Sequence, residues 1–126
     1  MVCDSNILIY TAEEEDGAIC QPYAESPDAL IASVTRIEVL GFRRFNDLPA
    51  ERQARLNSIV NTTTEVPLDN EIIVRAIALR QQKSMKLGDA IIAATALEYD
   101  LPLVTRNEDD FKHIPELRLI NPFASL

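Results

Sequence analysis

Carboxylate and amide side chains stand close to apolar, strand-like runs or helix starts at four places in this sequence. These places are Asp4 with Asn6, Glu38, Asp89, and Asn107 with Asp109 and Asp110. Oxygen ligands of this kind suit Mg²⁺ or Mn²⁺, and such an ion can orient water and stabilise the charge of an in-line phosphoryl displacement. This chemistry needs no histidine, and the sequence contains only His113, too little for a His-based metal site or triad.

Taken singly, each of these places also has a purely structural explanation. Asp4 would cap the helix that follows it, and Asp89 would cap the next apolar helix. Thr35 and Glu38 match the Thr-x-x-Glu capping box, in which each side chain satisfies the other's backbone donor. The acidic residues at 107–110 would form a polar turn. A functional site is therefore indicated only if the fold brings these places together.

The order of expected elements does bring them together. Strands are expected at 2–4, 29–34, 62–66, 101–105 and 117–120, although 29–34 also fits a buried helical turn. Helices are expected at 7–12, 21–26, 35–45, 49–59, 71–83 and 89–99. Strands that alternate with helices predict a mainly parallel sheet covered on both faces. The carboxyl ends of such strands meet at one edge, where acids distant in sequence converge.

Length and composition predict one domain, 1–126, of an ordinary globular class. Hydrophobic residues make up 47% and charged residues 25% of the 126 residues. No apolar run approaches the roughly 20 residues of a membrane span, and the first residues do not resemble a signal peptide, so a cytoplasmic location is expected. Cys3 and Cys20 are too few for a disulfide framework or a cysteine-rich zinc site.

The formal net charge of −8 argues against broad, nonspecific nucleic-acid binding, which depends on many contacts from Lys and Arg to phosphate. It does not exclude a nuclease. Clustered carboxylates repel one another unless a cation neutralises them, and that cation can itself bind a phosphate.

Four segments, in this order, resemble the motifs of PIN domains, especially the VapC-like toxins of type II toxin-antitoxin systems. They are Asp4-Ser5-Asn6-Ile7-Leu8-Ile9-Tyr10, Thr35-x-x-Glu38, Asp89-Ala90-Ile91-Ile92-Ala93-Ala94, and Leu103-Val104-Thr105-Arg106-Asn107-x-x-Asp110-Phe111. The resemblance covers nearly the whole chain. It implies a three-layer α/β/α sandwich with strand order 3-2-1-4-5 and a Mg²⁺- or Mn²⁺-dependent endoribonuclease.

The same resemblance assigns roles by position. Asp4, Glu38 and Asp89 would be the principal metal-binding and catalytic acids. Asn6 would support Asp4 by hydrogen bonding, and Thr35 or Thr105 would orient water or phosphate.

Two positions depart from the family pattern. The fourth acidic position falls on Asn107, and an amide is a weaker metal ligand than a carboxylate. Asp110, ahead of Asp109, is then expected to complete the site or to act through water. Ser5 stands where threonine is more usual, which keeps a hydroxyl group.

Partners also follow from the resemblance. VapC-like proteins are typically homodimers held inactive by a cognate antitoxin, whose C-terminal segment lies across the acidic site. A contact face for RNA or antitoxin, or else an ordinary solvated surface, is expected on the helices after the second strand at Arg36, Arg43, Arg44, Arg52 and Arg55.

Three other functions fit parts of the pattern. A HAD-like phosphatase would have a strand ending in Asp, but it needs a second Asp where Asn6 stands. A receiver-type phosphoacceptor domain needs an Asp at the end of the third strand, where Val66 and Pro67 stand. A PIN-fold protein that has lost catalysis and only binds a partner is the remaining alternative, and Asn107 is the residue that favours it.

Overall fold

The computed structural model describes residues 1–124 and contains a five-stranded, all-parallel sheet in the order β3-β2-β1-β4-β5. The strands are β1 Val2–Cys3, β2 Leu30–Ala32, β3 Thr64–Val66, β4 Leu103–Val104 and β5 Leu119–Ile120. The predicted strand order is therefore confirmed. Each of the five strands is shorter than expected.

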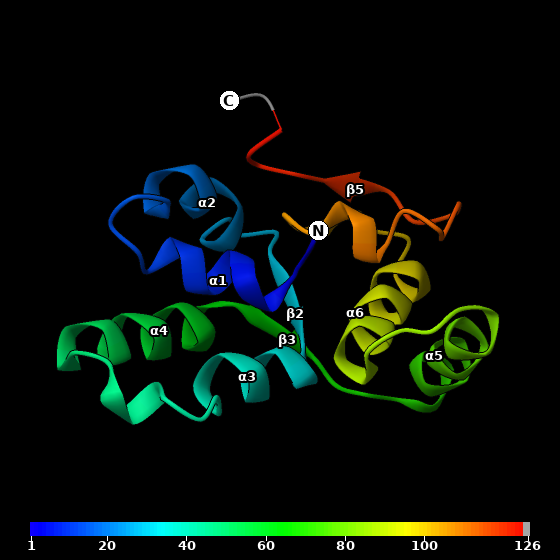
Figure 1. The fold of residues 1–126 in the computed structure, drawn as a ribbon, viewed down its shortest axis with the longest axis horizontal. Helices are drawn as coiled ribbons and strands as arrows, with labels where there is room; N and C mark the ends of the chain where they lie inside the picture. The colour runs from blue at the N-terminus through cyan, green and yellow to red at the C-terminus, as the bar shows by residue number, and fades with distance from the viewer. Residues whose placement is uncertain (125–126) are drawn as a thin grey trace.

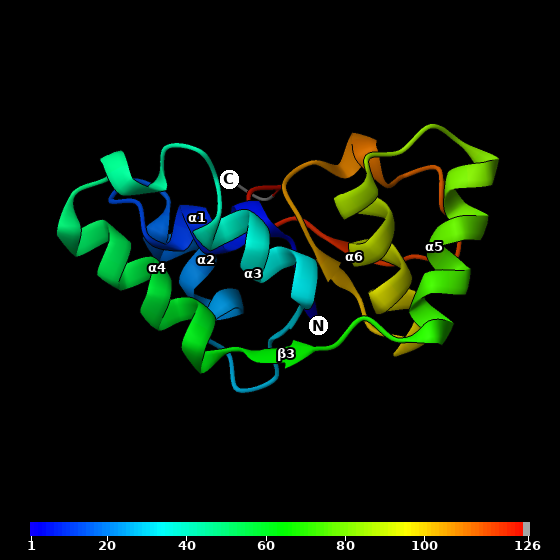
Figure 2. The ribbon, with the colours of Figure 1, turned by 90° about the horizontal axis from the view of Figure 1, so that it is seen from below.

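Six α-helices cover the two faces of this sheet. They are α1 Ser5–Thr11, α2 Gly17–Ala24, α3 Ser33–Leu40, α4 Ala50–Thr62, α5 Asn70–Gln82 and α6 Leu87–Glu98. Figures 1 and 2 show α1–α4 grouped on one side of the strands and α5 with α6 on the other. Two separate clusters of buried apolar side chains fill these two interfaces. The predicted three-layer α/β/α sandwich is confirmed.

The short central strand β1 is buried on both faces and holds the sheet in register. Val2 pairs with Leu30 of β2 and with Leu103 of β4, and Cys3 pairs with Val104. Val2 and Cys3 are fully buried, which matches the apolar character of parallel strands covered on both sides. Burial raises the pKa of the Cys3 thiol to about 12, so this cysteine is an apolar core residue.

Helix α6 begins at Leu87, with Lys86 as its N-cap residue. The prediction that Asp89 is the N-cap was wrong, because the extended backbone of Lys86 starts the helix and places Asp89 in the first turn. From there the helix is buried on most sides, at Ala90, Ile92, Ala93, Ala94, Thr95 and Ala96. The alanine-rich sequence allows this close packing against the sheet.

The predicted Thr35–Glu38 capping box is also wrong. Helix α3 follows β2 without a connecting loop, so its N-cap is Ala32, which makes no side-chain cap. Thr35 therefore lies within the helix with its side chain fully buried. Glu38 is not needed as a cap and remains available for other contacts.

Some helix boundaries differ from the prediction. Helix α2 spans 17–24 instead of 21–26 and contains Pro22, and helix α3 ends at Leu40 instead of Phe45. Gly41 is the C-cap residue of α3, and a Cβ added to it would lie 2.5 Å from the carbonyl oxygen of Ile37. A tight turn and a short 3₁₀ helix, Phe45–Asp47, then lead to α4.

The apolar residues of α5 do not all face the core. Asp69 caps this helix, its carboxylate accepting a 2.9 Å hydrogen bond from the N–H of Ile72, which is fully buried. Ile73 and Ile77 belong to the same apolar pattern of this helix as Ile72, but they are 41% and 53% exposed. They line a groove of about 560 Å³ that runs between α5 and α6.

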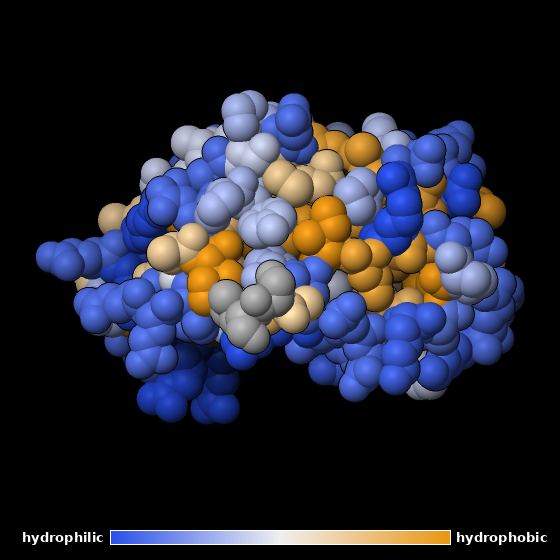
Figure 3. All heavy atoms as spheres, turned by 90° about the horizontal axis from the view of Figure 1, so that it is seen from above, coloured by the Kyte–Doolittle hydropathy of each residue, from blue (hydrophilic) through white to orange (hydrophobic). Residues whose placement is uncertain are grey.

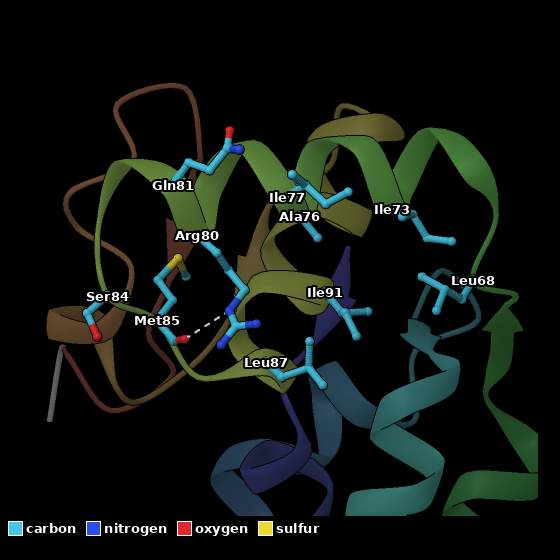
Figure 4. Close-up of a pocket in the computed structure, with 10 residues that line it drawn as sticks. All are labelled: Leu68, Ile73, Ala76, Ile77, Arg80, Gln81, Ser84, Met85, Leu87 and Ile91. Carbon is cyan, nitrogen blue, oxygen red and sulfur yellow. Dashed lines mark hydrogen bonds between the residues drawn. The ribbon is translucent and has the colours of Figure 1, made fainter.

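Figure 4 shows this apolar groove, whose lining residues are Leu68, Ile73, Ala76, Ile77, Arg80, Gln81, Ser84, Met85, Leu87 and Ile91. Arg80 is the one charged residue among them, and its Nε donates a 3.3 Å hydrogen bond to the carbonyl oxygen of Met85.

Figure 3 shows the side of the molecule that carries β5, where apolar atoms gather in the middle between hydrophilic ends. None of the helices in residues 1–124 has the length and apolar character that a membrane span requires.

Candidate functional site

One pocket at the carboxyl edge of the sheet gathers acids that are far apart in the sequence. Its volume is about 300 Å³. Its lining residues are Asp4, Ser5, Asn6, Ile9, Glu38, Phe42, Lys86, Asp89, Asn107 and Asp110. They come from α1, α3, the start of α6 and the segment after β4, so the fold itself assembles this site.

Asp4 stands between β1 and α1, with 6% of its surface exposed. Its Oδ1 accepts a 2.7 Å hydrogen bond from the N–H of Ser5, and its Oδ2 accepts a 2.9 Å hydrogen bond from the hydroxyl of Thr105. The Thr105 hydroxyl in turn accepts a 3.1 Å hydrogen bond from the N–H of Asn107. This chain of contacts fixes the segment after β4 relative to Asp4.

Glu38 is held by two features of its surroundings. Its Oε1 accepts a 2.6 Å hydrogen bond from the hydroxyl of Ser5. Its Oε2 lies against Gly88, where an added Cβ would be only 2.8 Å away. The absence of a side chain at Gly88 therefore lets the first turn of α6, which carries Asp89, approach Glu38 closely.

The carboxylates of the pocket influence one another strongly. Burial, together with the charges of Asp4 and Asp110, raises the pKa of Asp89 to about 6, while Lys86 acts in the opposite direction. Burial also raises the pKa of Asp4, although the hydrogen bonds from Thr105 and Ser5 oppose the shift. The site therefore carries negative charge that its own hydrogen bonds compensate only in part, and a bound cation would stabilise it.

The donor set fits a hard divalent ion, because four carboxylates and two amide oxygens supply the ligand type that Mg²⁺ and Mn²⁺ prefer. In residues 1–124, however, no three His, Cys, Asp or Glu side chains are grouped as an ion would require. Asp4 and Glu38 are instead directed to the hydroxyls of Thr105 and Ser5.

The structure brings together most of the residues expected from sequence. The site pocket contains Asp4, Asn6, Glu38, Asp89, Asn107 and Asp110, and Thr105 supports it through Asp4. Thr35 does not line this pocket, and its buried hydroxyl has no hydrogen-bond partner among the described residues.

Asp109 also lies outside the site pocket. Its carboxylate pairs with Lys112 at 2.9 Å and lines two neighbouring pockets. Of the two acids expected to compensate for Asn107, the structure therefore places Asp110 at the site.

Sequence reasoning did not assign Lys86, Ile9 or Phe42, which also line the pocket. Lys86 is its one basic lining residue. The spacing of Lys86 three positions before Asp89 was the available signal, because residues at i and i+3 are neighbours in the first turn of a helix. The wrong helix start, at Asp89, hid this relationship.

Comparisons with known proteins agree with the fold. A 41-residue segment is 42% identical to a protein named Ribonuclease VapC from Rickettsia bellii (strain RML369-C), and it spans 32% of this chain and only 31% of that protein. The structure is similar to a toxin-antitoxin complex from Klebsiella pneumoniae, with 31% identity and a TM-score of 0.74 over 97% of both chains. It is also similar to DNA-bound VapBC from Salmonella typhimurium, with 19% identity, a TM-score of 0.78 and 96% of both chains covered.

The Salmonella likeness supports the fold alone, because the identity is low. The family model described as "PIN domain" matches residues 1–117, which is most of the chain and includes every residue of the site pocket. This match excludes the HAD-like phosphatase and receiver alternatives. The chain belongs to the PIN domain family.

Proposed function

We propose that this protein is a Mg²⁺- or Mn²⁺-dependent endoribonuclease that hydrolyses RNA phosphodiester bonds. We further propose that it acts in the cytoplasm as the toxin of a VapBC-type toxin-antitoxin pair. The observation that carries this proposal is the convergence of Asp4, Glu38, Asp89 and Asp110 in one pocket. The similarity to a Ribonuclease VapC and to a toxin-antitoxin complex supports it.

In this proposal Asp4, Glu38, Asp89 and Asn107 hold the metal ion. When bound, such an ion compensates phosphate charge and lowers the pKa of a coordinated water. Asp110 supplies the carboxylate that Asn107 lacks, because it lines the same pocket. Asn6 lines the same pocket, but in residues 1–124 the expected hydrogen bond from its side chain to Asp4 is not formed, so its proposed role is a contact with substrate.

Two hydroxyl groups position these acids. Thr105 and the N–H of Ser5 hold the two oxygens of Asp4, and the hydroxyl of Ser5 holds Oε1 of Glu38, so both carboxylates are oriented by their neighbours. Hydrogen bonds from hydroxyl groups favour the charged form of a carboxylate. For the buried Asp4, these hydrogen bonds oppose the effect of burial on its pKa and so favour the form that binds a cation.

The activity test compares three proteins freed of any antitoxin and incubated with total RNA and Mg²⁺ or Mn²⁺. They are the wild type, Asp89→Asn, and the control Asp28→Asn, which changes an exposed acid before β2, at the opposite edge of the sheet. We expect cleavage by the wild type and the control only. Equal cleavage by Asp89→Asn would refute the site assignment.

The same experiment decides between the nuclease and the catalytically inactive binding protein. Absence of cleavage by the wild type with several metals would favour the inactive alternative, to which the amide at Asn107 gives some weight.

The proposed antitoxin would contact the basic helices after β2. Three of the five arginines there are already paired, Arg36 with Glu65, Arg44 with Asp47 and Arg55 with Glu25. Arg43 and Arg52 form no ion pair within residues 1–124 and are free to meet an acidic partner. A small open reading frame directly upstream, whose product co-purifies with this chain, would support the toxin assignment.

We also propose a homodimer that uses the apolar groove of α5 and α6. Four of the seven exposed large apolar side chains in the described residues, Leu68, Ile73, Ile77 and Leu87, line this groove. Clustered apolar exposure of this kind marks an interaction surface. A second copy fits because a two-fold contact requires a self-complementary patch, and this one is nearly free of charge.

A further inference from the structure

A second pocket, of about 250 Å³, adjoins the acidic site. Lys86, Asp89 and Asp110 line both pockets and form the boundary between them. The remaining lining residues of the second pocket are Lys83, Ser84, Met85, Asp109 and His113. A strand of nucleic acid bound across the acidic site would therefore reach this pocket with a neighbouring part of its backbone.

The lysines of this second pocket are exposed and available to an anion. Lys83 and Lys86 lie in the segment between α5 and α6, and neither forms an ion pair within residues 1–124. The third lysine of the chain, Lys112, is already paired with Asp109. In a protein with a net charge of −8, two unpaired lysines beside the acidic site are a distinct feature.

His113 adds an unsatisfied donor to the same pocket. Both of its ring nitrogens are buried, and neither has a hydrogen-bond partner among the described residues. A buried polar group without a partner is costly, and neutral imidazole always carries one N–H donor. The hydroxyl of Ser84 lies in the same lining and offers another donor.

The carboxylates in this pocket do not prevent anion binding. The charge of Asp109 is compensated by Lys112 at 2.9 Å. Asp89 and Asp110 belong to the acidic site, where the proposed metal ion compensates their charge. With the metal bound, the pocket presents mainly the cations and donors of Lys83, Lys86, Ser84 and His113.

We propose that Lys83, Ser84, Lys86 and His113 form a subsite for the RNA phosphate next to the scissile phosphodiester. This inference rests on the proposed ribonuclease function and names how its substrate is held. A phosphate contact positions the strand without reading its sequence, so the subsite contributes to affinity for any single-stranded RNA.

The test measures binding, not cleavage. A fluorescent single-stranded RNA is titrated with protein in Ca²⁺, which takes oxygen ligands and compensates the carboxylates, at several salt concentrations. Gel analysis confirms that the RNA stays intact. The proteins are the wild type, the double variant Lys83→Gln with Lys86→Gln, its charge-preserving counterpart with Arg at both positions, and His113→Phe. Arg118→Gln is the control, because Arg118 pairs with Asp100 beyond the far end of α6.

Neutralising one phosphate contributes about 0.7 to the slope of log K against log salt for a single strand. We expect the double glutamine variant to lose roughly this amount of slope and to bind more weakly, while the double arginine variant and Arg118→Gln keep the wild-type slope. His113→Phe should bind more weakly, because it removes a ring N–H donor from the pocket. Melting temperatures close to that of the wild type would show that the variants fold.

An unchanged slope and dissociation constant in the double glutamine variant would overturn the subsite. If the wild type still cleaves RNA, the ribonuclease function then stands without it. Failure of the wild type to bind or cleave any RNA would overturn both proposals. The two results are distinguished by the wild-type cleavage reaction.

Discussion

The hydroxyl of Thr105 donates a 2.9 Å hydrogen bond to Oδ2 of Asp4, although the two residues lie 101 positions apart in the sequence. They meet because β1 and β4 are adjacent parallel strands, and each residue follows the last residue of its strand. The contact is buried, so its loss leaves a desolvated carboxylate oxygen without that donor. Thr105 therefore contributes both to the stability of the fold and to the orientation of Asp4 in the acidic site.

Replacing Thr105 by valine keeps the shape of the side chain and removes both of its hydrogen bonds. We expect the free energy of unfolding to fall by about 1–3 kcal/mol, the range for a buried polar group left without its partner. Urea denaturation at neutral pH measures this loss. Thr105→Ser is the matched control, since it keeps the hydroxyl, and an equal loss in both variants would assign the effect to packing.

Ser5 is expected to position Glu38 rather than to act on substrate directly. Its hydroxyl donates a 2.6 Å hydrogen bond to Oε1 of Glu38. Ser5→Ala should weaken metal binding, because Glu38 would no longer be oriented, whereas Ser5→Thr should preserve it. Isothermal titration with Mn²⁺ measures the affinity of each variant. Identical affinities for the wild type and Ser5→Ala would show that the hydrogen bond does not orient a ligand.

The features predicted correctly from the sequence are those that depend on a pattern repeated along the chain, such as the alternation of strands and helices. Alternating strands and helices predicted the layers, and the strand ends predicted the meeting of Asp4 with Asp89. Local capping patterns were less reliable, because tertiary contacts decided where helices begin. Helix α3 begins at Ser33, two residues before Thr35. The hydroxyl of Ser33 donates a 2.8 Å hydrogen bond to Oε2 of Glu65 in β3, so a contact with the sheet is found at this helix start where a Thr35 cap was expected.

Hydrophobic periodicity also did not distinguish the core residues of α5 from the residues that line the groove. Ile72 and Ile77 both belong to the apolar pattern of α5, but only Ile72 packs into the core. A residue that covers the core and one that faces a groove have the same apolar character. The neighbouring helix α6 separates the two roles, and its packing is not visible in the local pattern.

The raised pKa of Asp89 predicts how stability depends on pH without metal. Its pKa is about 6 in the folded protein against an ordinary value of 3.8. Between these values the folded state holds a proton that the unfolded state has released, so stability falls as the pH rises through this window. Asp89→Asn lacks this titration.

In EDTA, the melting temperatures of the wild type and Asp89→Asn should therefore be similar near pH 4. Above about pH 6 the wild type should melt at the lower temperature, because it then carries the unfavourable charge. The comparison cancels the titration of other groups. A temperature difference that stays constant across this range would contradict the assigned burial and charge repulsion at Asp89.

Divalent metal should offset the loss of stability that the charge of Asp89 causes above about pH 6. Because the ion binds the folded state, Mg²⁺ or Mn²⁺ at a hundredfold excess over Kd should add about 2.7 kcal/mol of stability. Differential scanning fluorimetry at pH 7.5 should show a rise in melting temperature for the wild type and for Asp28→Asn. Asp4→Asn and Glu38→Gln should respond less. A wild-type melting temperature indifferent to millimolar metal would count against the site.

The last prediction concerns the apolar groove between α5 and α6. Ile77 is 53% exposed there, and Tyr99, beyond the end of α6, is 47% exposed without lining the groove. Ile77→Glu would place a charge within the proposed two-fold contact, and burying an unpaired charge is costly. Sedimentation velocity should therefore show a dimer for the wild type and Tyr99→Glu, and a monomer for Ile77→Glu. A wild-type monomer at tens of micromolar, or a dimer that survives Ile77→Glu, would remove the groove as the dimer interface.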